Sequence, residues 1–154
     1  MFRRIMAFLI SVAVAIALAS IAHSLVIQSA WTLAASHADG AGPVALSIAD
    51  RLSWIWHDLV GMETNDVPFG AAVAPALFLG LMIAGQVSRF VGLRTLAYSS
   101  AGAVSIFAMF MAIKATQGTI GLAGARSVFG MSVQVAIGAL AGLMFARLTS
   151  SREL

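Results

Sequence analysis

The sequence predicts an all-α integral membrane protein: a four-transmembrane-helix bundle with a short amphipathic surface helix in the outer loop between helices 1 and 2. Three observations lead to this prediction. Of the 154 residues, 60% are hydrophobic and only 10% are charged, which is too few to cover a water-facing surface. Four windows contain no Asp, Glu, Lys or Arg, namely residues 5–38, 67–88, 95–113 and 127–146. Each window reaches the roughly 20 residues that a helix needs to cross a bilayer.

The first predicted span covers about residues 5–28, because the second half of its window is more polar. The two arginines in residues 1–4, the apolar run and the small residues Ala17 and Ala19 on either side of Leu18 also resemble a signal peptide with a cleavage site. The apolar stretch continues past this site through Val26 and Ile27. We therefore expect a retained membrane anchor, with cleavage as the alternative.

The outer loop, about residues 29–68, contains a predicted interfacial helix over about residues 48–60. Ser47 and Asp50 have the spacing of a helix-capping pair, and Gly61 is a typical C-terminal stop. Between these positions apolar residues recur at helical spacing: Ile48, Leu52, Ile55 and Leu59. Trp54 and Trp56 have the amphipathic rings that prefer the headgroup level of a membrane. We expect this helix to lie on the outer membrane surface or over the bundle.

The remaining spans are predicted at about residues 69–88, 95–115 and 125–146. The turn at 89–94 is short, so the second and third spans should be antiparallel neighbours. A glycine-containing turn at 117–124 joins the third and fourth spans. Residues 1–154 therefore form a single membrane domain in this prediction.

Small residues spaced four apart predict how the helices pack. In lipid, helices associate through close backbone approach and interhelical hydrogen bonds rather than through hydrophobic burial. Each span has such a stripe, at residues 11, 15, 19 and 23; 72, 76, 80, 84 and 88; 104, 108, 112 and 116; and 130, 134, 138, 142 and 146. The helix-packing positions that we single out are Gly80, Gly130, Gly138 and Gly142.

The distribution of basic residues predicts the orientation. With the N-terminus in the cytoplasm, the inner side holds Arg3, Arg4, Arg89, Arg94, Arg147 and Arg152. The outer side then holds Arg51, Lys114 and Arg126. Because cytoplasmic loops are enriched in Lys and Arg, this count favours a multi-pass protein of a bacterial inner membrane with both termini cytoplasmic.

Polar side chains at membrane depth are the best sequence indicators of function. We expect His23, Lys114, Arg126 and Gln134 to converge in the outer half of the bundle, as a candidate polar pocket or solute path. The alternative is structural: interhelical hydrogen bonds, with Lys114 and Arg126 extending to the headgroups.

Metal, cofactor and nucleic-acid binding are not expected. The chain has no cysteine, and the outer-loop candidates His37, His57 and Asp58 match no known metal-ligand spacing. His23 as a haem ligand would need a second axial ligand, which the sequence does not identify. The nine Lys and Arg residues are scattered and form no basic patch of the kind that binds nucleic acid.

No catalytic motif accompanies these residues, so enzyme activity stays open but is not favoured. We expect a small non-catalytic integral membrane protein, an accessory, assembly or interaction subunit. Its expected partners are membrane lipids and either a protein partner or further copies of itself as a homo-oligomer. The alternative is an oligomeric channel or small-solute transporter that uses the polar cluster.

Overall fold

The fold is all-helical in the part of the chain that the structure, a computed structural model, describes: residues 2–38, 46–64 and 69–150. Its α-helices are α1 (Phe2–Ala38), α2 (Ile48–Thr64), α3 (Phe69–Val91), α4 (Arg94–Gln117) and α5 (Val128–Thr149). A single 3-10 turn, η1 (Ala123–Ala125), precedes α5, and these described residues contain no strand. Four of the helices, α1, α3, α4 and α5, are long and apolar enough to cross a membrane. The predicted helical bundle with four such helices is confirmed at this level.

Two helices extend past their predicted limits. α1 continues to Ala38 rather than ending near residue 28, because no Gly or Pro interrupts the helix there. At 1.5 Å per residue, its 37 residues span roughly 55 Å, well beyond a ~30 Å hydrocarbon core. α2 passes Gly61 and ends at Thr64, so the predicted stop at this glycine is wrong. A helix-interior Gly costs only about 1 kcal/mol and does not end a helix unless the backbone turns left-handed.

Left-handed glycines do mark the ends of α3 and α4. Gly92, with φ at +71°, forms the tight turn between these antiparallel helices. Gly118, with φ at +74°, follows the last residue of α4 and donates its backbone N–H to the Lys114 carbonyl. A side chain at either position would strain the backbone, so glycine determines where both turns occur.

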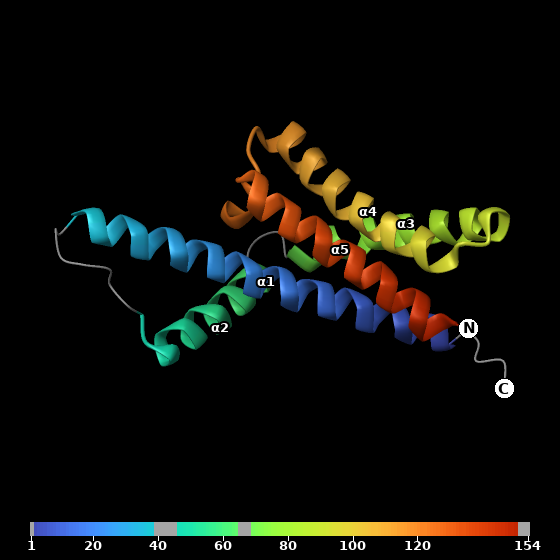
Figure 1. The fold of residues 1–154 in the computed structure, drawn as a ribbon, viewed down its shortest axis with the longest axis horizontal. Helices are drawn as coiled ribbons and strands as arrows, with labels where there is room; N and C mark the ends of the chain where they lie inside the picture. Colours follow the sequence, from blue (N-terminus) through green and yellow to red (C-terminus); the bar gives the residue numbers. More distant parts are fainter. Residues whose placement is uncertain (1, 39–45, 65–68, 151–154) are drawn as a thin grey trace.

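The helices are arranged so that α5 packs between α1 and α4, while α3 packs mainly on α4 (Figure 1). We call the end of the bundle that holds the start of α1, the α3–α4 turn and the end of α5 the terminal end. The opposite end, with η1 and the start of α5, is the loop end. Residues 24–38 of α1 and helix α2 project beyond the loop end and form what we call the arm (Figure 1).

Small residues bring α4 and α5 into backbone contact. A Cβ added at Gly138 would overlap the Gly102 carbonyl, and one at Gly142 would overlap the Tyr98 carbonyl. The other two predicted packing positions are also tight, since a Cβ at Gly80 would meet Ser105 and one at Gly130 would meet the Gly124 carbonyl. Beside these contacts, Leu77 and Phe110 fill the core and are almost fully buried.

The four small-residue stripes differ in how far they are buried. The stripe on α5 is buried throughout, and Ser11, Ala15 and Ala19 of the α1 stripe are buried as well. The stripe on α3 is buried or half-buried. In contrast, the α4 stripe, Val104, Ala108, Ala112 and Thr116, is exposed along its whole length. The bundle therefore uses three stripes internally and leaves the α4 stripe on its surface.

Candidate functional site

His23 connects α1 to the turn before α5. Its Nδ1 accepts a hydrogen bond from the Gly124 backbone N–H at 3.1 Å. The bond requires an unprotonated Nδ1, so a neutral ring carries its proton on Nε2. Glycine is needed at position 124, because a Cβ there would lie 2.8 Å from His23 Nδ1. His23 thus anchors η1 against α1.

Gln134 forms a second connection one helical turn along α1. Its side chain is 2% exposed, and its Nε2 donates to the Ala19 carbonyl at 3.2 Å. This bond joins α5 to α1 in the interior of the bundle. A buried amide would be costly without such a partner, so the bond stabilises one specific packing of the two helices.

Arg126 and Lys114 are both exposed, unlike the more buried His23 and Gln134. Arg126 is exposed, and its Nε donates to the Ile120 carbonyl at 2.9 Å, which closes the turn before α5. The next residue, Ser127, caps α5 by accepting the Gly130 N–H at 3.0 Å. Lys114 is exposed in the last turn of α4. Of the four residues predicted to form a polar pocket, three therefore hold elements together at the loop end and Lys114 stands apart.

The shallow cavity beside Arg126 does not unite these residues. It has a volume of about 570 Å³ and lies along α4, η1 and α5, lined by Arg126, Ser127, Met131, Phe107 and other residues. His23, Gln134 and Lys114 do not line it. The shared polar pocket stays a prediction.

A row of buried polar residues on α1 holds the arm, and the sequence analysis did not single it out. Ser24 donates a hydrogen bond to the Asp58 carboxylate, and Gln28 Nε2 donates to the Arg51 carbonyl at 3.2 Å. One turn further along α1, the rings of Trp31 and Trp54 meet edge to face at 5.8 Å between centroids. The signal that was present is the spacing of Ser20, Ser24 and Gln28, which places three polar side chains on one helical face.

The metal candidates are not assembled into a site in the part of the chain described. No group of three or more His, Cys, Asp or Glu side chains in that part lies close enough together to hold a metal ion. His57 is exposed, while its neighbour Asp58 accepts the Ser24 hydrogen bond. The side chain of His37 lies outside the described residues.

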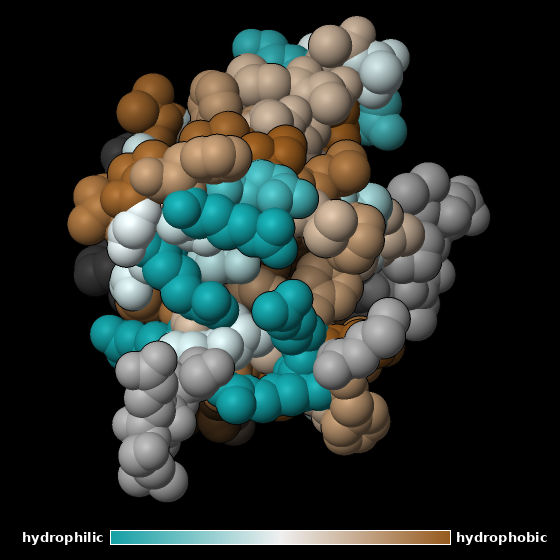
Figure 2. Space-filling model, turned by 90° about the vertical axis from the view of Figure 1, so that its right-hand side faces the viewer, coloured by the Kyte–Doolittle hydropathy of each residue, from teal (hydrophilic) through white to brown (hydrophobic). Residues whose placement is uncertain are grey.

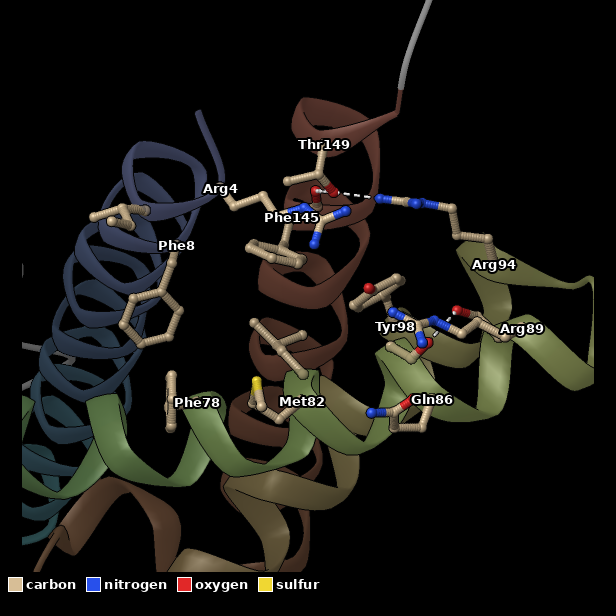
Figure 3. A pocket seen from close by; sticks show the side chains of 14 residues that line it. Arg4, Phe8, Phe78, Met82, Gln86, Arg89, Arg94, Tyr98, Phe145 and Thr149 are labelled. Carbon is tan, nitrogen blue, oxygen red and sulfur yellow. Dashed lines mark hydrogen bonds between the residues drawn. The ribbon is translucent and has the colours of Figure 1, made fainter. Parts of the chain in front are cut away.

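The terminal end contains a second cavity, of about 560 Å³, which the sequence did not predict. Its walls come from α1, α3, α4 and α5 and are mostly apolar, with Phe8, Phe78, Leu81, Met82 and Phe145 among the lining residues. Three arginines, Arg4, Arg89 and Arg94, also line it (Figure 3). No sequence motif indicates this cavity, because its lining comes from separate helices.

Hydrophilic side chains gather on the surface of the terminal end (Figure 2). The basic residues of that end are Arg3, Arg4, Arg89, Arg94 and Arg147. Arg3 donates to the carbonyls of Leu148 and Ser150, which ties the start of α1 to the end of α5. Basic charge is therefore concentrated where two helix ends and one interhelical turn meet.

The two ends thus differ chemically: hydrogen bonds between elements dominate the loop end, and arginines around an apolar cavity dominate the terminal end. Neither arrangement brings together a nucleophile, a base and an orienting group of the kind that catalysis requires, within the residues described. No protein-family model, curated protein or solved structure matches the chain. Function has to be inferred from the chemistry of the chain's own residues.

Proposed function

We propose that the chain is a four-span integral membrane protein of a bacterial inner membrane, with both termini cytoplasmic. The support is the apolar length of α1, α3, α4 and α5 together with the distribution of basic residues. Arg3, Arg4, Arg89, Arg94 and Arg147 lie at the terminal end, whereas Arg51, Lys114 and Arg126 lie toward the other side. Because cytoplasmic segments are enriched in Lys and Arg, this distribution supports a cytoplasmic terminal end.

In this orientation α2 is the surface helix of the outer side. Two of its polar groups, the Asp58 carboxylate and the Arg51 carbonyl, accept hydrogen bonds from α1. Its opposite face exposes an apolar stripe at four-residue spacing: Ile48, Leu52, Trp56 and Val60. An apolar helix face of this kind is suited to the interface between headgroups and acyl chains.

Within the membrane, the proposed role is that of a non-catalytic accessory or interaction subunit. One observation carries the proposal: the α4 stripe is exposed while the other three are used inside the bundle. Val104, for example, is 65% exposed. Small side chains let a second helix approach closely, which is the main route to helix association in lipid. The proposed occupant of this stripe is a transmembrane helix of a partner protein.

The hydrogen bonds of the buried polar residues favour the interaction role over a channel or solute path. The His23 ring and the Gln134 amide bind backbone groups of neighbouring elements of the chain itself. Side chains that make such bonds stabilise packing, whereas a path needs polar groups directed into an open lumen. The channel alternative finds no comparable observation in its favour.

Membrane insertion and orientation can be tested by cysteine labelling, because the chain has no native cysteine. Single cysteines at Ser53 on α2 and at the exposed Leu93 in the turn between α3 and α4 are treated with a membrane-impermeant maleimide in intact spheroplasts. We expect labelling at position 53 from outside and at position 93 only after the membrane is opened. The reverse pattern would contradict the orientation, and recovery of the chain in the soluble fraction would contradict insertion.

The interaction role is tested by placing bulk on the α4 stripe. Ala108→Leu and Ala112→Leu should leave the fold intact but remove a partner that co-purifies with the wild type in mild detergent. Ile83→Phe on the exposed face of α3 is the matched control and should retain the partner. Native mass spectrometry reads the result. A second copy of the chain in place of a different protein would identify a homo-oligomer, and a wild type found only as a monomer would reject the role.

A further inference from the structure

The cavity at the terminal end combines two properties that belong together in one class of ligand. Its walls are apolar, and its edge carries the side chains of Arg4, Arg89 and Arg94 (Figure 3). At about 560 Å³ it has the size of a small-molecule site. A ligand that satisfies both properties has an apolar chain and an anionic head.

The apolar part is well defined. Phe8 of α1 and Phe78 of α3 meet edge to face, with 5.8 Å between ring centroids, and form one wall (Figure 3). Phe145 of α5 lies across from them and packs on Tyr98 at 5.3 Å between centroids. Leu81 is a buried part of the lining, and Met82 is a flexible side chain that adapts to an irregular ligand.

The arginines at this cavity have unused hydrogen-bonding capacity. In the part of the chain described, Arg4 and Arg89 make no side-chain hydrogen bond and no ion pair, and both are exposed. Arg94 is partly engaged, because its Nη2 donates to Thr149 Oγ1 at 2.5 Å and its guanidinium lies 5.2 Å from the Tyr98 ring centroid. Its Nε is nevertheless buried without a hydrogen-bond partner in this structure.

No described acidic residue neutralises this charge. The two acidic side chains that the structure describes, Asp50 and Asp58, both belong to α2, on the far side of the bundle. Guanidinium groups bind phosphate through paired N–H donors, which makes a phosphate group the natural complement of three arginines.

We propose that this cavity binds an anionic phospholipid, with its phosphate among Arg4, Arg89 and Arg94 and an acyl chain along the aromatic walls. The proposal rests on the membrane insertion and orientation proposed above, but not on any protein partner. In that orientation the cavity faces the cytoplasmic leaflet, whose anionic lipids attract basic residues near the membrane surface.

The experiment measures lipid binding to the purified full-length protein by native mass spectrometry. The probes are phosphatidylglycerol, phosphatidylcholine of the same chain length, and inorganic phosphate. We expect phosphatidylglycerol to bind the wild type, and Arg4→Gln and Arg89→Gln each to weaken it about fivefold, as expected for one basic residue at a membrane surface. Arg147→Gln is the matched control, because it removes the same charge from the same end but does not line the cavity.

The outcomes separate the proposal from its alternatives. Equal weakening by Arg147→Gln would show general attraction to basic charge and overturn the site. Equal binding of phosphatidylcholine, or unchanged binding in both cavity variants, would also overturn it. Displacement of the lipid by inorganic phosphate would show an anion site without acyl recognition and would overturn the lipid proposal. The cysteine labelling decides insertion independently, so failure of lipid binding in a correctly inserted protein counts against this site alone.

Discussion

The two ends of the bundle differ in how closely their elements pack and in how their polar side chains are paired. At the loop end, the backbones of η1 and α5 come into contact at Gly124 and Gly130, and His23 and Gln134 donate or accept hydrogen bonds across elements. At the terminal end, helices diverge around a cavity, and Arg4 and Arg89 have no hydrogen-bond partner among the described residues. The loop end therefore uses its polar groups within the fold, whereas the terminal end leaves the hydrogen-bonding capacity of two arginines unused among the described residues.

The largest expected effect comes from adding one methyl group at the loop end. Gly130→Ala would drive a Cβ into the Gly124 carbonyl oxygen, which belongs to the backbone and cannot rotate away. We expect a loss of about 3 kcal/mol or more in the free energy of unfolding, measured by circular dichroism in detergent. Gly61→Ala is the control, since a Cβ at this α2 position meets nothing within 4 Å. A stable Gly130→Ala protein would show that the loop end is not closely packed.

Gln134→Leu is expected to have the next largest effect. It removes the hydrogen bond from α5 to the Ala19 carbonyl in the interior of the bundle and leaves that carbonyl with its intrahelical bond alone, at a cost of about 1–2 kcal/mol. The exposed Gln117→Leu, also at the loop end, should change the unfolding free energy much less. Equal effects of the two substitutions would mean that the bond from Gln134 does not join α1 to α5 in the folded protein.

Arg94→Gln tests the one cavity arginine that also holds the terminal end together. The substitution removes the bond to Thr149 and the contact over Tyr98, and we expect a loss of about 1 kcal/mol. Unfolding curves in lipid-free detergent measure it. A loss as large as that of Gly130→Ala would place the terminal end, too, among the regions that determine the fold.

The smallest effects are expected for Arg4→Gln and Arg89→Gln. Because neither guanidinium has a hydrogen-bond partner among the described residues, each substitution should change the free energy of unfolding in lipid-free detergent by less than about 0.5 kcal/mol. Added phosphatidylglycerol should then stabilise the wild type more than either variant. Substantial destabilisation without lipid would mean that these arginines serve folding rather than binding.

Local sequence patterns determined the helices. The charge-free windows of about 20 residues predicted four long apolar helices, and the structure contains four helices of that length and apolarity. The same patterns placed the packing glycines, because small residues four apart share a helix face, and Gly138 and Gly142 do lie at backbone contacts. The helix limits at Gly61 and near residue 28 could not be predicted as well, since a single glycine or a more polar stretch does not by itself end a helix.

Only the tertiary structure decided which polar groups meet. His23 and Gly124 are 101 positions apart, and no local periodicity specifies that the ring would receive this N–H. The rotation of each helix about its axis decided that the α4 stripe is exposed while the α5 stripe is buried. The arginine cavity likewise depends on four helices converging, because its lining residues extend from Arg4 to Thr149. The sequence determined which segments are helices, and long-range packing determined which of their faces remain free.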